Sequence, residues 1–302
     1  MSVLTELAEH FPQLYLKPET GISQSEIYRA IVRRGEQYKG DLSHFIGSPD
    51  DSLTIESTPA GEVSVVFLKQ RSDFECFYRI MAARCEPIPI PPSVGATYIG
   101  GINDWSKIKA HMEEYCRMGG EDTKSEFSRF TSDSSNYKIS MILLSDGPYS
   151  ALSYDKTPYG EDEWKTVSLN IRRYHELTHF VCRRLYPQKR NAVWDELLAD
   201  CYGLLCAVGS YQLELAQSFL GIENGAYIGG RLESYLKDSL DEEMIKEVSG
   251  LTGLLAELCP KSFNRREDNY KTVIDFENKS DEILKDFPLI SAQKIETAVN
   301  KK

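Results

Sequence analysis

No stretch of this sequence is long and apolar enough to cross a membrane as a helix. Its first residues, MSVLTELAEHFPQLYLK, lack the basic start and the uninterrupted apolar run of a secretory signal. The seven cysteines are an odd number, and no two are spaced as C-x-x-C. This pattern argues against a disulfide framework and against a zinc site made of cysteines. We therefore expect a cytoplasmic protein that does not bind a membrane.

The chain also lacks an excess of positive charge, because 46 acidic residues outweigh 35 lysines and arginines and leave a net charge of −11. Nucleic acid is therefore not an expected partner. The one basic cluster is formed by Arg172, Arg173, Arg183, Arg184, Lys189 and Arg190. We expect most of this cluster to be the solvated outer face of a helix; the alternative is a surface that docks an acidic substrate or partner.

A chain of 302 residues can bury a sizeable core as one large or two modest domains. The polar, serine-rich stretch 120–137 is the best candidate boundary. It predicts an N-terminal α/β subdomain over 1–137 and a catalytic subdomain over 138–302. The predicted fold class is α+β, with a small mixed sheet followed by a mainly helical C-terminal half.

Several local patterns predict the elements of the N-terminal part. Ser23 and Glu26 are spaced as a capping box for a helix that ends near Gly40. The alternating, valine-rich run 62–69 predicts a strand. The proline- and glycine-rich run 86–104 predicts an extended, ordered loop.

The segment 138–154, KISMILLSDGPYSALSY, has the pattern of a strand, an Asp-Gly turn and a returning strand. We expect either a purely structural hairpin or an edge strand beside the next helix.

The most informative stretch begins with His175, Glu176 and His179 in the pattern H-E-x-x-H. Apolar residues recur at helical spacing around it, so residues from about 170 to 186 are predicted to form one amphipathic helix. The two histidines are then one turn apart, with Cβ atoms roughly 5 to 6 Å from each other, and their imidazoles can reach a single metal ion. Glu176 is too close in sequence to the first histidine to join them comfortably, but it can accept a proton from water at the metal. We therefore predict that Glu176 is the general base.

A second predicted helix supplies the third ligand that a catalytic zinc site needs. Apolar residues from Trp194 to Leu205 mark this helix, and the short loop before it favours antiparallel packing on the first helix. Glu196, near its start, can then face the histidines. Asp200, one turn further on, can accept the free ring N–H of a metal-bound histidine.

This arrangement, H-E-x-x-H followed by a helix with E-x-x-x-D, resembles the active site of the gluzincin zinc metallopeptidases, the group typified by thermolysin. The resemblance is confined to these two helices. It implies that His175, His179 and Glu196 bind Zn²⁺, that Glu176 acts as base, and that Asp200 supports a ligand. The implied activity is hydrolysis of a peptide or protein substrate.

One feature departs from the resemblance, because no histidine follows His179. Thermolysin-like enzymes use a later histidine to stabilise the oxyanion, and others of the group use a tyrosine. The candidates for a donor in this chain are Tyr227, Arg231 and Tyr235.

Two interpretations of the site remain. The first is a zinc-dependent peptidase. The alternative is a regulatory or protein-interaction module that binds metal on a metallopeptidase-like fold without cleaving peptides. A helix surface with a charged network and no metal is the plain structural interpretation of the same residues.

Overall fold

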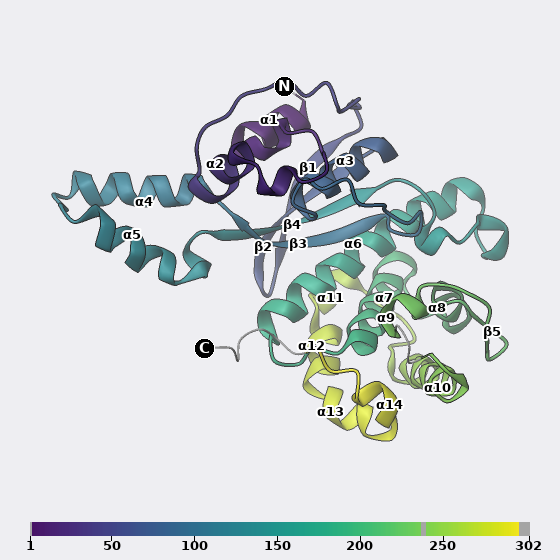
Figure 1. Cartoon of the computed structure of the whole chain (residues 1–302). Coiled ribbons are helices and arrows are strands. Elements are labelled where there is room, and N and C mark those ends of the chain that lie inside the picture. Colours follow the sequence, from purple (N-terminus) through teal and green to yellow (C-terminus); the bar gives the residue numbers. More distant parts are fainter. Residues whose placement is uncertain (1, 237–239, 296–302) are drawn as a thin grey trace. The chain divides into compact units, whose positions relative to one another are not determined.

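The computed structural model describes residues 2–236 and 240–295 (Figure 1). These residues form an α+β fold with a small mixed sheet and a mainly helical C-terminal half, so the predicted fold class is confirmed. The chain divides into two compact units. The first comprises Met1–Glu56, Val63–Ile90 and Tyr98–Ser145, and the second comprises Ser57–Glu62, Pro91–Thr97 and the chain from Asp146 onward. The division at residue 137 stays a prediction, and the strand after it belongs to the first unit.

The sheet has four strands in the order β1-β2-β4-β3. Strands β1 (Ser52–Thr58) and β2 (Gly61–Leu68) are joined by a two-residue turn, which only antiparallel neighbours allow. Strand β4 (Lys138–Ser145) runs parallel to β2, with Val65 opposite Ile142. The consecutive residues from Met141 to Ser145 are all buried, as expected for an inner strand.

Helices α1 (Val3–His10), α2 (Glu26–Arg34) and α3 (Arg71–Met81) lie on one face of this sheet (Figure 1). The capping residue of α2 is Ser25 rather than Ser23, because the Ser25 side chain accepts the Tyr28 N–H. The helix also ends earlier than predicted. Gly35 adopts a left-handed conformation with φ of 66°, and it satisfies the carbonyls of the last turn.

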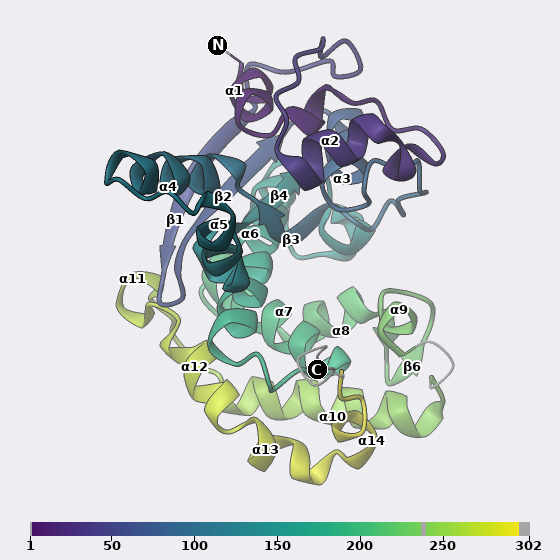
Figure 2. The same cartoon turned by 60° about the vertical axis from the view of Figure 1, so that its left-hand side comes forward.

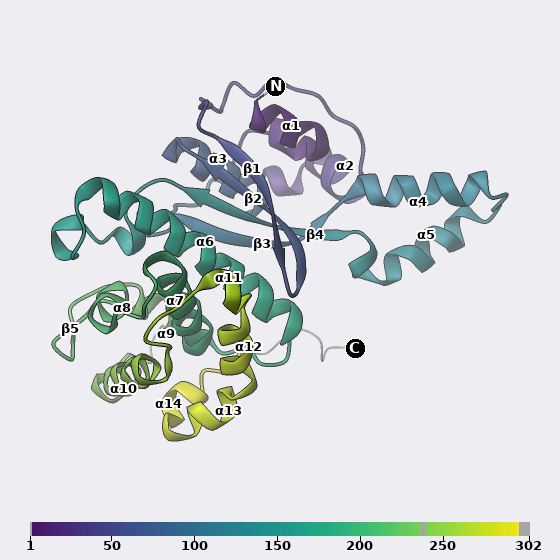
Figure 3. The same cartoon turned by 180° about the vertical axis from the view of Figure 1, so that it is seen from behind.

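Regular structure is found both in the run predicted to be an extended loop and in the stretch predicted to be a domain boundary. The run 86–104 includes strand β3 (Ala96–Asn103), because its prolines all precede Ala96 and leave the later N–H groups free to pair. The polar stretch 120–137 includes helix α5 (Thr123–Ser132), which begins where Asp122 caps the Ser125 N–H. Together with α4 (Trp105–Arg117), α5 forms a helical hairpin that extends from the sheet (Figure 3).

The predicted hairpin over residues 138–154 is wrong in its second half. The Asp-Gly turn leads into two short 3-10 helices, Tyr149–Ala151 and Tyr154–Lys156, instead of a returning strand. Strand β4 is also not the edge strand that was the alternative prediction, because it lies between β2 and β3 in the sheet. Strand β4 thus pairs in parallel with β2, which is distant in sequence, and not with an antiparallel strand formed by the residues that follow it.

The second unit is built around two helices, α6 (Glu161–Leu185) and α7 (Ala192–Val208). Helix α6 begins earlier than predicted, with three acidic residues in its first turn that interact favourably with the helix dipole. The helices pack closely near Gly203. A Cβ at that position would lie 3.0 Å from the carbonyl oxygen of Ile171, which is tighter than most contacts of this kind, so glycine favours the close approach of the two helices.

Further elements surround this pair. They are α8 (Leu213–Leu220), the β5 (Ile222–Glu223) and β6 (Ala226–Tyr227) hairpin, α9 (Leu232–Leu236), α10 (Glu242–Leu258), α11 (Arg265–Asp268), α12 (Lys271–Asn278), α13 (Ser280–Ile283) and α14 (Pro288–Ser291). Helix α12 packs on both α6 and α7, and α14 packs on α10 (Figure 2). Among the described residues, none of the helices combines the length and the apolar character that crossing a membrane requires.

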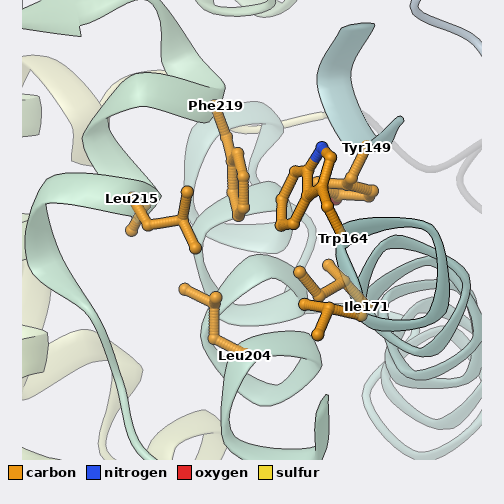
Figure 4. Close-up of a cluster of buried hydrophobic side chains, with 8 residues drawn as sticks. Tyr149, Trp164, Ile171, Leu204, Leu215 and Phe219 are labelled. Carbon is orange, nitrogen blue, oxygen red and sulfur yellow. The ribbon is translucent and has the colours of Figure 1, made fainter. Parts of the chain in front are cut away.

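A buried apolar cluster holds α6, α7 and α8 together (Figure 4). Trp164 and Ile171 of α6 meet Leu204 of α7 and Phe219 of α8. Tyr149 joins the cluster from the loop before α6, with its ring 4.7 Å from that of Phe219. The ring of Tyr149 is thus part of the core, whereas its hydroxyl group lies at a polar site.

A buried carboxyl group on α12 predicts a pH-dependent stability. Glu277 is inaccessible to solvent. Burial and the nearby charge of Asp195 raise the pKa of Glu277 to about 7, although Cys182 and Lys189 partly oppose this shift. The folded state therefore keeps a proton that the unfolded chain releases above about pH 4.5. Stability from this group is present below that pH and is lost as the pH rises through 7.

We expect Glu277→Gln to remove this dependence, because the neutral amide resembles the protonated carboxyl group. The variant should match the parent protein near pH 4.5 and exceed its unfolding free energy by up to about 3 kcal/mol above pH 8. Urea unfolding of both proteins across this range measures the difference. Glu282→Gln, which removes the same charge from an exposed position, is the control. If the unfolding free energies of Glu277→Gln and the parent protein differed equally at pH 4.5 and above pH 8, Glu277 would not be the source of the pH dependence.

Candidate metal centre

Helix α6 presents His175 and His179 on one face, as their spacing predicts. Both side chains are buried, each 5% exposed. Their Nε2 atoms face each other at 3.1 Å, and the ring planes are nearly perpendicular. Two imidazole nitrogens this close together can supply two of the four ligands of a tetrahedral metal site.

Helix α7 brings Glu196 to the same point. One oxygen of its carboxylate lies 3.3 Å from Nε2 of His175, and the other lies 3.3 Å from Nε2 of His179. Asn191 caps α7 by accepting the N–H groups of Val193 and Trp194, which sets where the helix begins. The position of Glu196 therefore results from a local cap and from the packing of α7 on α6.

These three side chains fit a metal ion by distance. Ligand atoms bound about 2.0 to 2.1 Å from a tetrahedral centre lie about 3.3 Å from one another. The Nε2–Nε2 separation of 3.1 Å is close to that value, and each Nε2 has one of the two Glu196 oxygens at 3.3 Å. Among the described residues, His175, His179 and Glu196 are the group of side chains whose atoms converge in this way.

The charges around the histidines also favour a cation. Burial alone lowers the pKa of His175, but hydrogen bonds to Asp200 and Glu196 outweigh burial and raise it to about 10. Burial raises the pKa of Glu196, but the two histidines outweigh it and hold that pKa well below its usual range. A positive charge at this place is therefore strongly stabilised, whether a proton or a metal ion carries it.

Asp200 lies behind His175, as the sequence predicts. Its Oδ1 is 2.8 Å from Nδ1 of His175, on the opposite side of the ring from the ligand nitrogen. Burial raises the pKa of Asp200, but Arg231 and His175 together lower it below its usual value. Asp200 is therefore an ionised acceptor for the imidazole.

Glu176 is the residue after the first histidine on α6 and is 8% exposed. A carboxylate at this position belongs to the same helical turn as His175 but to another face. The carboxyl group is thus largely shielded from solvent, and its role as general base stays a prediction.

The three candidate oxyanion donors lie in different surroundings. The Tyr227 hydroxyl lies 2.9 Å from the Gly230 carbonyl oxygen and 2.9 Å from a Glu233 carboxylate oxygen, close to it in sequence, and it accepts the Gly230 N–H. Arg231 bonds to Asp200 and Tyr149, behind the histidine. The Tyr235 hydroxyl lies beside the Glu196 carboxylate. Burial raises the pKa of the Tyr235 phenol, and the Glu196 carboxylate adds to this shift, so the phenol lies near a metal ligand.

The structure also brings Tyr149 to the site, which the sequence does not predict. Its hydroxyl lies 2.6 Å from Oδ1 of Asp200 and 2.9 Å from Nδ1 of His175. Tyr149 belongs to no motif and begins a short 3-10 helix, so no periodic pattern indicates where its side chain points. The only signal is the preceding Asp-Gly pair, which indicates a turn but not the conformation of the residues after it.

Part of the basic cluster is buried, against expectation. Arg172 is 3% exposed. Its guanidinium donates to the carbonyl oxygens of Gly147 and Pro148 at 2.6 and 2.7 Å. Arg190 pairs with Asp195 at 2.7 Å. These two arginines therefore serve the fold rather than a solvated face.

A protein-family model matches residues 1–294 of the chain, and its description is a family of unknown function (DUF7005). No curated protein and no solved structure matches the chain. Neither a reaction nor a ligand comes from these comparisons, so the chemistry has to be inferred from the side chains themselves.

Proposed function

The chain belongs to this family of unknown function, and from its metal centre we propose that it is a zinc-dependent peptidase. His175, His179 and Glu196 would hold Zn²⁺, and Glu176 would act as the general base. The substrate would be a peptide or protein. All seven cysteines are free thiols, which supports a reducing compartment, the cytoplasm, as the place of this activity.

The observation that carries the proposal is the convergence of two imidazole nitrogens and one carboxylate, with separations of 3.1 to 3.3 Å. Three protein ligands of this kind are typical of catalytic zinc, which keeps a fourth position for water or substrate. Structural zinc sites, in contrast, are closed by four protein ligands.

The reaction assigns a distinct task to each side chain. Bound Zn²⁺ would supply a Lewis acid that polarises the peptide carbonyl and makes water a stronger acid. Glu176 accepts a proton from water as the water adds to the carbonyl carbon. The same carboxyl group then gives this proton to the leaving amine, so that each product receives its share of the water molecule.

A donor is also needed where negative charge develops on the carbonyl oxygen. Tyr235 is the proposed donor, because its phenol lies beside Glu196. Burial raises the pKa of Tyr235 well above its usual value, and the charge of Glu196 adds to this effect although Arg231 opposes it. A protonated phenol can donate throughout the neutral range.

The second candidate function is a metal-binding module that does not cleave peptides. It is favoured by the lack of any histidine after His179 and by the involvement of Arg231 with Asp200. Both observations reduce the number of groups available to stabilise an oxyanion. Metal content is the same for the two functions.

Peptide cleavage distinguishes them. The protein is freed of metal with a chelator, reloaded with one equivalent of Zn²⁺, and incubated with a peptide library whose products are identified by mass spectrometry. We expect cleavage with zinc and none with chelator. Zinc binding without cleavage of any library member would support the non-proteolytic module instead.

A further inference from the structure

Behind His175 lies a second set of polar groups that the reaction does not use directly. The Arg231 guanidinium donates to the Tyr149 hydroxyl at 2.8 Å and to Oδ2 of Asp200. The same guanidinium lies 4.9 Å from the centre of the Tyr149 ring. Tyr149 and Asp200 are 4% and 2% exposed, so water does not replace these contacts.

The hydrogen bonds around Nδ1 of His175 allow only one arrangement of protons. The Tyr149 hydroxyl has one proton, which it donates to Oδ1 of Asp200 at 2.6 Å. Arg231 donates and accepts nothing, and ionised Asp200 only accepts. Nδ1 of His175, which lies 2.8 Å from Asp200 and 2.9 Å from the Tyr149 oxygen, must therefore carry a proton. When the ring is neutral, Nε2 is therefore the nitrogen whose lone pair is available to a metal, and this atom faces Glu196 and His179.

The loop before α6 is held in a strained conformation that delivers Tyr149. Ser150 and Ala151 both have positive φ, 54° and 57°. A positive φ at a residue other than glycine destabilises the folded state by about 1 kcal/mol or more, and this conformation persists only where surrounding contacts impose it. Here Ser168 accepts the Tyr149 N–H at 2.9 Å, and the Ser150 hydroxyl donates to the Phe219 carbonyl at 3.1 Å. Buried Arg172 holds the two preceding carbonyl groups.

Arg231 is delivered by a second tight contact. Gly221, with φ of 83°, packs directly against Gly229 and Gly230. A Cβ on Gly221 would lie 2.4 Å from the Gly229 carbonyl oxygen, and a Cβ on Gly230 would lie 2.7 Å from the Gly221 Cα. Only glycine at these positions lets the backbone approach so closely. Gly230 immediately precedes Arg231, so this contact between two backbone segments fixes the position of the Arg231 backbone.

We propose that Tyr149 and Arg231 are positioning residues that orient Asp200 and hold His175 in the tautomer that binds metal. Arg231 also balances the negative charge of Asp200. The carboxylate of Glu196 is then the negative charge that the three ligands present to the metal ion. The proposal rests on the proposed function only in taking this centre as a metal site. Under this proposal Arg231 positions Asp200 behind His175 and does not donate a hydrogen bond to the oxyanion.

The test is the affinity for zinc alone, measured by competition with a chromophoric chelator. Tyr149→Phe keeps the ring in the apolar cluster and removes only the hydroxyl group. We expect its zinc dissociation constant to rise about tenfold, and Arg231→Met to produce a rise of similar or larger size. With Co²⁺ in place of zinc, the visible absorption band of Tyr149→Phe should shift, because His175 is less strictly oriented.

Tyr159→Phe is the matched control. Tyr159 packs on the same apolar cluster, and its hydroxyl accepts a hydrogen bond from Gln212 outside the metal centre. This variant should bind zinc with the affinity of the parent protein and give the same cobalt band. Thermal unfolding in chelator shows how much each lost hydroxyl group costs the fold itself.

Each outcome decides between the two proposals. Parent-like zinc affinity and cobalt spectrum in Tyr149→Phe would overturn the positioning role and leave the peptidase untouched. Weakened zinc binding in this variant, together with no cleavage by the parent protein, would support the positioning role and reject the peptidase. A parent protein that binds no zinc would reject both.

Discussion

Replacing Glu176 with glutamine is expected to abolish peptide cleavage while leaving zinc bound. The amide has nearly the shape of the carboxyl group, so the buried position beside His175 stays filled. It cannot accept a proton from water, and loss of a general base lowers turnover by about 10² to 10⁴-fold. Cleavage of the best library peptide and zinc content by elemental analysis are measured on the same preparation.

Glu163→Gln is the matched control for this experiment, because it removes a carboxylate from an exposed position on the same helix. It should cleave at the parent rate. Turnover by Glu176→Gln above a few per cent of the parent would rule out Glu176 as the base. Loss of zinc from this variant would show instead that the side chain supports the metal.

Replacing His179 with alanine is expected to remove the metal itself. Two of three ligands remain, and the partly exposed carboxylate of Glu196 loses a partner at 3.3 Å. We expect zinc content to fall from one equivalent to near zero and cleavage to disappear with it. Glu196→Gln should also lower the affinity for zinc, since the neutral amide no longer balances the charge of the ion.

Ligand-linked stability gives an independent measurement of the same loss. Zinc at about 100 times its dissociation constant should raise the unfolding free energy of the parent protein by about 2.7 kcal/mol. His179→Ala should show no such increase. His10→Ala, at a side chain that is 43% exposed, should behave as the parent. An equal zinc-induced increase in His179→Ala would contradict its assignment as a ligand.

The part of the molecule that the sequence predicts best is the helical pair. A helix places residues four apart on one face whatever surrounds it, so the apolar periodicity around His175 and His179 is enough to bring them together. The Asn191 cap and the short loop before it place Glu196 within reach of them. In the structure these three side chains converge.

Errors arise where a partner is distant in sequence. Residues 138–154 have the local pattern of a hairpin, but β4 pairs in parallel with β2, more than seventy residues earlier. The polar stretch 120–137 has the composition of a boundary, although most of it forms α5. Local propensity favours turns and loops at these places, and tertiary pairing overrides it.

By itself, the sequence determined which atoms meet on α6, because helical spacing is a property of the backbone. Only the tertiary structure decided what lies behind them. Tyr149 reaches His175 through a strained loop, and Arg231 reaches Asp200 after two glycine backbones pack together. Neither position can be inferred from a repeating pattern, since each depends on contacts between segments that are far apart along the chain.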